Sequence, residues 1–218
     1  MAYSSGFRNK LVTILNRKEQ TVGKYGIDSA GVEWEAVGTV WANVSWAKGN
    51  RAMNNGSLDV YGVENIVRIG SAGSYRESLN VMDVVLVNQS YSDSTYARMM
   101  NGCIDKVIMP SPDLNEIITQ TAVERNVPLK LAAVHSTDVF YVDPRMESFL
   151  QLRDRTKADC VEMESFALFH NANVLGRRAA CLLTISDSFC TKTEISSAER
   201  ETSLTVMIEL ALESAIRF

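Results

Sequence analysis

The sequence contains few of the residues that mark metal, disulfide or membrane proteins. It has two histidines and four cysteines (Cys103, Cys160, Cys181 and Cys190), and no two cysteines stand in a CxxC spacing. A zinc site is therefore not expected, and the cysteines are expected to be free thiols in a reducing cytosol. No apolar run approaches the ~18 residues of a membrane-spanning helix, and the first residues lack the apolar core of a signal peptide. These absences predict a cytoplasmic protein without a metal.

An excess of charge of one sign is also missing. The chain has 22 basic and 26 acidic residues, for a net charge of -4, which gives no indication of a nucleic-acid partner. Hydrophobic residues make up 46% and charged residues 22%, as in ordinary soluble globular proteins. A chain of 218 residues is long enough for one large domain or two small ones with a sizeable core.

Proline and cysteine are absent from residues 1–62, and this absence divides the chain. All four prolines and all four cysteines lie in residues 63–218, whereas all three tryptophans and eight of the twelve glycines lie in residues 1–62. The first segment carries seven basic and five acidic residues, so the remainder carries the whole acidic excess. We therefore predict a domain boundary near Tyr61–Gly62.

The first segment, residues 1–62, is predicted to be rich in β-strand. Apolar and polar residues alternate on both sides of Gly38, which is typical of two paired strands. The segment has no histidine, cysteine or paired-acid motif, so no catalytic site is expected there. The predicted strands are residues 11–15, 32–36 and 40–46, and the predicted turns are residues 23–26 and 54–56.

The second segment, residues 63–218, alternates predicted strands and helices. This order indicates an α/β sheet with helices on both sides, in which ligands lie beyond the carboxyl ends of the strands. The predicted strands are residues 65–69, 81–87, 129–134, 160–163 and 179–185. Four helices are predicted. The first is capped by Asp113, and the second follows Pro144 and carries Met146, Phe149 and Leu150. The third runs from Phe166 past His170 to a cap at Gly176, and the fourth begins at a capping box, Ser196–Glu199, and carries Leu204, Met207, Ile208, Ala211 and Ala215.

Two strand ends indicate an anion site and an aromatic wall. The strand at residues 65–69 contains Arg68 and runs into Gly70-Ser71-Ala72-Gly73, where glycines let backbone N–H groups approach an anion. A plain turn is the alternative there. Polar residues at His135–Asp138 precede the aromatic pair Phe140 and Tyr141, for which core packing is the alternative.

Two further strand ends carry carboxylates. Glu162 and Glu164 alternate with Val161 and Met163, which places an acid either in water on a half-exposed strand or in a pocket where it accepts hydrogen bonds from vicinal hydroxyls. Asp187 follows the most apolar strand, and burial there would raise its pKa as a general acid requires. A helix or turn cap is the alternative for Asp187.

Residues from about 60 to 218 resemble the carboxyl-terminal two thirds of a bacterial hexameric purine nucleoside phosphorylase. The resemblance implies a three-layer α/β/α fold with a mixed sheet, incomplete here and preceded by the small β-rich segment. His135 and His170 match no catalytic position of that family. The matching stretches are Tyr61–Gly73, Asp138–Tyr141, Val161–Glu164, Ser186-Asp187 and Ala198–Arg200.

The resemblance implies a pentosyltransferase that carries out reversible phosphorolysis of purine (deoxy)ribonucleosides to free base and pentose 1-phosphate. Inorganic phosphate is the co-substrate, no metal or organic cofactor is implied, and the family assembles as a homo-oligomer, a hexamer. The implied roles are phosphate binding by Arg68, Gly70 and Ser71, ribose binding by Met163 and Glu164, base binding by Phe140, Val161, Glu162 and Ser186, protonation of purine N7 by Asp187, and assistance to Asp187 by Arg200.

The amino-terminal part of the family is not found in residues 1–62. That part carries a Gly-Asp-Pro phosphate loop, and this segment has no proline. Its stretch Glu33–Val44 resembles instead the front of tailed-phage head-closure proteins, which are small β-rich structural proteins. Three functions follow: a phosphorylase with impaired phosphate binding, a phage head–tail joining protein, or a non-catalytic nucleoside binder.

Overall fold

The computed structural model describes residues 24–27, 33–35, 64–139, 143, 145–196 and 204–218. Strand β1 (Lys24–Ile27) pairs antiparallel with β2 (Glu33–Glu35), so the strand predicted at residues 32–36 is confirmed over its centre. The turn predicted at residues 23–26 is wrong over residues 24–26, which lie in β1. The boundary predicted near Tyr61–Gly62 lies outside the described residues.

Six strands of the second segment form one mixed sheet that closes on itself. The strand order is β5-β4-β6-β7-β3-β8, and β8 pairs both with β3 (parallel) and with β4 (antiparallel). The strands are β3 (Asn65–Ser74), β4 (Val84–Tyr91), β5 (Val107–Ile108), β6 (Leu129–Ser136), β7 (Cys160–Glu162) and β8 (Arg178–Ser188). The helices are α3 (Tyr96–Asn101), α4 (Pro112–Glu124), α5 (Phe149–Thr156), α6 (Ser165–Val174) and α8 (Thr205–Ala215).

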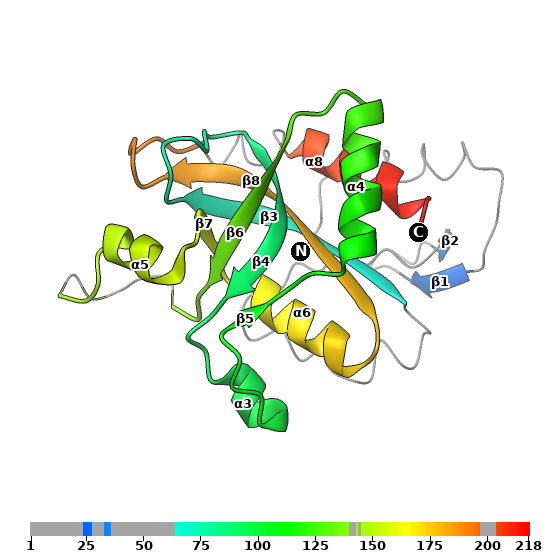
Figure 1. The fold of residues 1–218 in the computed structure, drawn as a ribbon. Coiled ribbons are helices and arrows are strands. Elements are labelled where there is room, and N and C mark those ends of the chain that lie inside the picture. Colours follow the sequence, from blue (N-terminus) through cyan, green and yellow to red (C-terminus); the bar gives the residue numbers. More distant parts are fainter. Residues whose placement is uncertain (1–23, 28–32, 36–63, 140–142, 144, 197–203) are drawn as a thin grey trace.

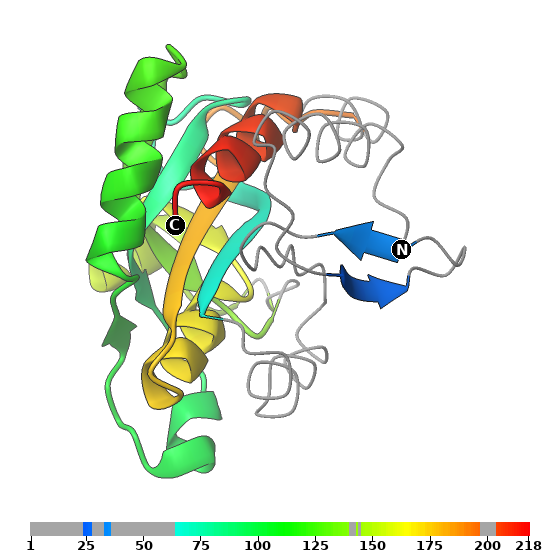
Figure 2. The same ribbon diagram turned by 90° about the vertical axis from the view of Figure 1, so that its right-hand side faces the viewer.

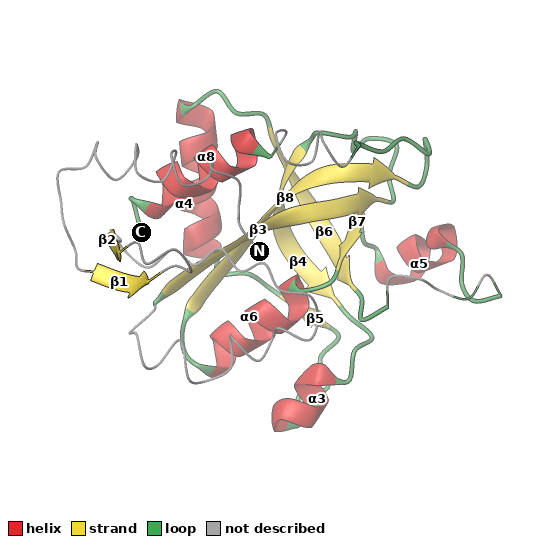
Figure 3. Ribbon diagram, turned by 180° about the vertical axis from the view of Figure 1, so that it is seen from behind, coloured by secondary structure: helices red, strands yellow, loops and turns green. Residues whose placement is uncertain are grey.

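Helices cover both faces of the sheet, as predicted. Figures 1 and 3 show α4 and α8 together on one side of the strands and α6 on the other, and Figure 2 shows α4 and α8 side by side. Because successive side chains of a strand point to opposite faces, Ala180 and Leu182 of β8 pack towards α4 and α8, whereas Cys181, Leu183 and Ile185 pack towards α6.

Two apolar clusters result from this alternation. The first joins α6 to the sheet through Phe166, Leu168, Phe169 and Ala172. The second joins α4 and α8 to the opposite face through Leu114, Ile118, Met207, Leu210 and Ala211. Among the described residues, no helix is long and apolar enough to cross a membrane.

Several predicted boundaries are shifted, and the most consequential shift is at Gly70–Gly73. The predicted loop is wrong, because β3 continues through this stretch to Ser74 and pairs with β8 along its length. The strand predicted at residues 81–87 begins at Val84, since a turn with Met82 at φ +77° precedes it. The strands predicted at residues 129–134, 160–163 and 179–185 are confirmed.

The helix starts also differ from those predicted. Ser111 rather than Asp113 precedes α4, and the Asp113 carboxylate accepts a hydrogen bond from Arg178 at 2.5 Å. Met146 lies before α5, whose first turn is closed by a capping box between Ser148 and Gln151. Helix α8 begins at Thr205; the capping box predicted at Ser196–Glu199 extends into residues that the structure does not describe. Gly176, at φ +62°, follows the end of α6 as predicted.

Candidate active site

The predicted strand ends meet in one row across the closed sheet. In register, Tyr91 of β4 pairs with His135 of β6, His135 with Val161 of β7, Val161 with Gly73 of β3, and Gly73 with Asp187 of β8. Residues more than one hundred positions apart in the sequence are therefore direct neighbours. The pairing brings the predicted base-binding residue Val161 to within one strand of the predicted acid Asp187.

Helix α6 begins directly after β7, and Glu162 holds this junction. The Glu162 side chain is only 1% exposed. Its carboxylate accepts hydrogen bonds from the backbone N–H groups of Glu164 (2.9 Å) and Ser165 (3.0 Å) and from the Ser165 hydroxyl (2.7 Å). These are N–H groups that a helix start leaves without intrahelical partners, so Glu162 acts as a cap although it lies before Glu164, the residue at the N-cap position.

Arg68 of β3 reaches the same junction from the neighbouring part of the sheet. Its side chain is 11% exposed, and one guanidinium nitrogen, Nη2, donates to Glu164 Oε2 and lies 3.4 Å from Glu162 Oε2. The other, Nη1, lies 3.8 Å from the Cys181 sulfur. Burial acts to lower the pKa of Arg68, but the charges of Glu162 and its other neighbours outweigh it and raise that pKa. Arg68 is therefore a permanent cation held between two acids.

Glycine at position 70 makes room for the Arg68 side chain. A Cβ atom on Gly70 would lie 2.4 Å from Arg68 Nη1, well inside van der Waals contact. Ser71, the next residue, is exposed. On this edge β3 pairs with β7 only at Gly73 and Ser74, so among the described strands none covers the backbone edge of Gly70 and Ser71.

Glu164 is the partly open carboxylate of the cluster. Its side chain is 20% exposed. Burial raises the pKa of Glu164, and the Arg68 charge acts in the opposite direction. A carboxylate with part of its surface open can accept hydrogen bonds from vicinal hydroxyls of a bound sugar.

Asp187 lies at the far end of β8, against Gly73. The Ser186 hydroxyl donates to Asp187 Oδ1 at 2.7 Å. A Cβ atom on Gly73 would lie 2.7 Å from both Asp187 Oδ2 and the Phe189 ring. Gly73 therefore lets the carboxylate and the ring lie directly on the β3 backbone, which fixes the position of the Asp187 carboxylate.

An aromatic cluster beside Asp187 is a feature that the sequence reasoning missed. Phe189 packs edge-on against Tyr75 with ring centroids 5.4 Å apart, and against Phe149 of α5 at 5.6 Å. The Tyr75 hydroxyl lies 3.3 Å from His135 Nδ1. Phe189 lies two residues after Asp187 of the predicted motif. Its contacts with Tyr75 and Phe149 join segments far apart in the sequence, and no sequence periodicity reveals such contacts.

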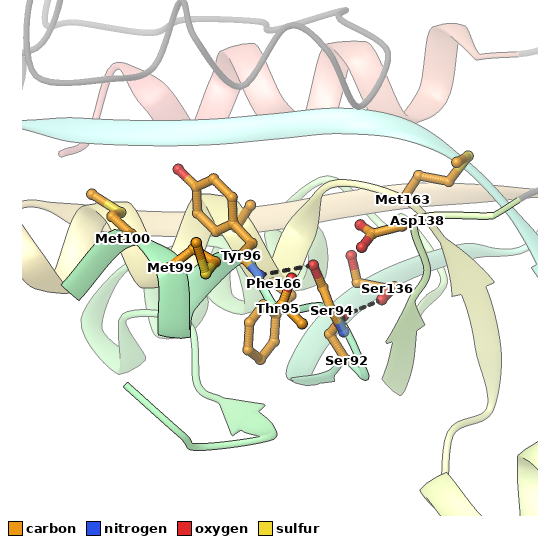
Figure 4. Close-up of a pocket in the computed structure, with 11 residues that line it drawn as sticks. Ser92, Ser94, Thr95, Tyr96, Met99, Met100, Ser136, Asp138, Met163 and Phe166 are labelled. Atoms are coloured by element: carbon orange, nitrogen blue, oxygen red, sulfur yellow. Dashed lines mark hydrogen bonds between the residues drawn. The ribbon is translucent and has the colours of Figure 1, made fainter. Parts of the chain in front are cut away.

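A cavity of about 490 Å³ adjoins the start of α6 (Figure 4). Among the predicted site residues that the structure describes, only Met163 lines it. Two hydrogen bonds lie in its wall: the Ser92 hydroxyl donates to the Ser136 carbonyl at 2.6 Å, and the Ser94 hydroxyl accepts from the Tyr96 N–H at 3.1 Å. The lining residues are Ser92, Ser94, Thr95, Tyr96, Met99, Met100, Ser136, Asp138, Met163, Phe166 and Ala167.

The predicted site residues thus fall into two neighbouring groups. Arg68, Glu162 and Glu164 contact one another, and Ser186 and Asp187 contact one another across from Gly73 and Val161. Phe140 and Arg200 lie outside the described residues, so their roles stay predictions. Within the described part of the chain, no three His, Cys, Asp or Glu side chains are placed to share a metal ion.

Known proteins are similar to this chain over most of its length. Residues 48–216 match the phosphorylase superfamily. A DeoD-type purine nucleoside phosphorylase from Geobacillus sp. (strain WCH70) is 35% identical over 164 residues, which cover 75% of this chain and 68% of that protein. The DeoD-type enzyme from Clostridium perfringens (strain SM101 / Type A) is 37% identical over 156 residues, which cover 72% of this chain and 66% of the relative. The chain thus spans about two thirds of the length of these relatives.

Solved structures share the fold. A 5'-methylthioadenosine/S-adenosyl homocysteine nucleosidase from Campylobacter jejuni superposes with a TM-score of 0.76 at 16% identity, covering 99% of this chain and 96% of that one. A futalosine hydrolase mutant from Helicobacter pylori superposes with a TM-score of 0.70 at 20% identity, covering 96% and 95%. At these identities the likeness concerns the fold alone. The match over residues 48–216 and the DeoD-type relatives place this chain in the phosphorylase superfamily, to which it belongs.

Proposed function

We propose that the chain binds a purine nucleoside and inorganic phosphate and transfers the pentosyl group from the base to phosphate. The observation that carries the proposal is the buried cluster of Arg68, Glu162 and Glu164 at the start of α6, one strand away from Asp187. It combines a cation for phosphate with a partly open carboxylate for the ribose hydroxyls. The DeoD-type relatives support the same assignment.

The reaction can be written for these residues. The bond between C1′ and the purine nitrogen breaks, and its electron pair goes to the base. Asp187 in its acid form donates a proton to purine N7, which offsets the charge that develops there, an effect typically worth ~10²–10⁴ in rate. A phosphate oxygen, held by Arg68 and Ser71, then bonds to C1′ and gives pentose 1-phosphate.

The sugar and the base have separate partners in this proposal. Glu164 accepts the ribose hydroxyls, and Met163 packs on the sugar. Val161 and Ser186 face the base together with Phe140, while Arg200 assists Asp187; all four roles are carried over from the resemblance. No metal or organic cofactor takes part, so dialysis against a chelator is expected to leave the rate of base release unchanged.

The proposal is tested by incubating the chain with inosine in the presence and absence of phosphate. Phosphate-dependent appearance of hypoxanthine together with ribose 1-phosphate is the expected result. Free ribose in place of the phosphate ester would mean hydrolysis, and the absence of base release at high protein concentration would remove phosphorolysis altogether.

A second candidate is a nucleoside binder without turnover, and one observation favours it. Arg68 is already paired with two carboxylates, so the cluster of three carries net negative charge before a phosphate dianion enters. Like charges close together oppose anion binding. Calorimetric binding of inosine without any base release would identify this function.

The proposal also includes assembly and location. We expect a cytoplasmic homo-oligomer, as the resemblance implies. Sedimentation or light scattering of the purified chain measures its mass in solution, and a monomer would contradict the oligomer.

A further inference from the structure

We propose that Glu162 is a positioning residue: it fixes Glu164 and Arg68 for the nucleoside and contacts neither the base nor phosphate itself. This inference rests on the proposed function and deepens it. It replaces the base-binding role that the family resemblance implies for Glu162.

The contacts of Glu162 leave it little capacity for a ligand. One carboxylate oxygen, Oε1, accepts from the Ser165 N–H (3.0 Å) and from the Ser165 hydroxyl (2.7 Å). The other, Oε2, accepts from the N–H groups of Glu164 (2.9 Å) and Ser165 (3.0 Å) and lies 3.4 Å from Arg68 Nη2. Because the Ser165 N–H is shared between both oxygens, three donors form these hydrogen bonds, and together with the ion pair to Arg68 they leave at most one of the roughly four acceptor positions of an ionised carboxylate. With its side chain 1% exposed, Glu162 has no surface for a purine.

The support for Glu162 continues into the sheet. The Ser165 hydroxyl has a single hydrogen, which it donates to Glu162, so in its 2.8 Å contact with the hydroxyl of Ser90 it accepts. Both serines are fully buried. The chain of contacts therefore runs from Ser90 on β4 through Ser165 to Glu162, and it anchors the start of α6 to the closed sheet.

Glu162 acts on both of its neighbours at once. Its bond to the Glu164 N–H sets the backbone from which the Glu164 side chain extends. Its charge shares the Arg68 guanidinium with Glu164, which limits how tightly Arg68 can hold Glu164. Without the Glu162 charge, Arg68 would bind Glu164 more strongly, so Glu164 would be less available to sugar hydroxyls and the site would repel phosphate less.

The test is steady-state kinetics of Glu162→Gln, which keeps the shape and removes the charge. We expect the KM for inosine to rise about tenfold or more, the effect of weakening a charged hydrogen bond, while the KM for phosphate does not rise. A merely structural role would instead raise both constants together. If Glu162 contacted the base, the variant would differ from the wild type in its preference between inosine and adenosine, while the KM for phosphate would be equal in the two proteins. Either of these results overturns the proposal.

Two other variants keep the test sound. Glu213→Gln is the matched control, because Glu213 is also a buried acid paired with an arginine, Arg125 at 2.5 Å, but on α8. It is expected to leave both KM values unchanged.

Ser165→Ala removes one donor to Glu162 and replaces Glu162→Gln in the test if that variant does not fold. A smaller rise in the KM for inosine alone is expected. Equal rises in the KM for inosine and the KM for phosphate would count against the proposal.

Calorimetry separates this proposal from the proposed function. If the wild-type chain binds inosine but releases no base, phosphorolysis is removed, and Glu162→Gln must still weaken inosine binding about tenfold. Equal inosine affinity in the wild-type and Glu162→Gln chains would overturn the positioning role whether or not turnover occurs. A wild-type chain that does not bind inosine overturns both.

Discussion

The two faces of the closed sheet bury different chemistry. Towards α4 and α8 the cluster is apolar with the buried Thr184 hydroxyl against Met207, and the acid Glu213 nearby pairs with Arg125, whose side chain is 44% exposed. Towards α6 there is also an apolar cluster, and next to the start of that helix lies Arg68 of β3. The Arg68 side chain is 11% exposed and lies between two acids. On the first face the cation, Arg125, stays in contact with water, whereas on the second face the cation, Arg68, is largely removed from water.

This difference separates stability from chemistry. Apolar burial stabilises the fold without fixing an orientation, whereas a buried ion cluster pays a desolvation cost and is weak evidence for a role in stability. We therefore expect substitutions on the α4 and α8 face to act on unfolding and substitutions at the start of α6 and the end of β8 to act on substrates.

The largest effect is expected for Asp187→Ala. Removal of the acid proposed to protonate the base should lower kcat at least ~100-fold, with little change in the free energy of unfolding. Spectrophotometric base release and urea unfolding measure the two quantities. Asp154→Ala, at an acid of α5 whose side chain is 65% exposed, is the control and should change neither. An unchanged kcat in Asp187→Ala would contradict the proposal that Asp187 protonates the base.

The opposite result is expected on the other face. Leu210 of α8 is 1% exposed in the apolar cluster, and Leu210→Ala should lower the free energy of unfolding by about 2–5 kcal/mol. At a temperature where the variant is fully folded, its KM and kcat should match the wild type. Val206→Ala, at a position 46% exposed on the same helix, should cost much less. A loss of kcat in folded Leu210→Ala would break the separation of the two faces.

The two glycines of β3 should affect different kinetic constants. A methyl group at Gly70 would push the Arg68 guanidinium away, so Gly70→Ala should raise the KM for phosphate about tenfold. At Gly73 the methyl group would meet Asp187 Oδ2 and Phe189, so Gly73→Ala should lower kcat instead. Each variant is the control for the other. The same change in both constants for both variants would mean that β3 is simply distorted.

The smallest effect concerns pH. Burial lowers the pKa of His135, so as the pH falls below about 6.5 the unfolded chain takes up a proton that the folded chain refuses. The free energy of unfolding should therefore decrease from pH 7.5 to pH 5.5 through this residue, and His135→Gln should lose less over that interval. Urea unfolding at both pH values measures the difference. An equal loss in both proteins would exclude His135 as a contributor.

What could be predicted from the sequence was decided by local pattern. The apolar run at residues 179–185 and the helix from Phe166 to His170 carry their own periodicity, and both were predicted correctly. The carboxylates Glu162 and Glu164 were recognised as a cluster because they alternate with apolar residues at a strand end. The pairing of β4 with β8 was not predicted, since it joins segments about one hundred residues apart and leaves no local signal.

The error at Gly70–Gly73 has the same cause. Glycine usually indicates a turn, and nothing nearby in the sequence shows that Arg68 and Asp187 lie over these two backbones. The role of Glu162 was also hidden, because the alternation leaves open whether this acid lies in water or in a pocket and does not show that the start of α6 occupies both of its oxygens. Pairing with the distant strand β8 decides the first case, whereas the second depends on local hydrogen bonds of Glu162 with Glu164 and Ser165.

The position of β8 in the sheet determines when the protein can fold. β8 pairs with both β3 and β4, and among the described strands of the sheet it is the last in the sequence. During synthesis the earlier strands leave the ribosome first, and their apolar faces stay incompletely covered until β8 has been made. Domains fold as units, and long-range pairing is slow. Premature termination before β8 would therefore leave an open sheet with exposed edges, a substrate for chaperones and proteases rather than a smaller enzyme.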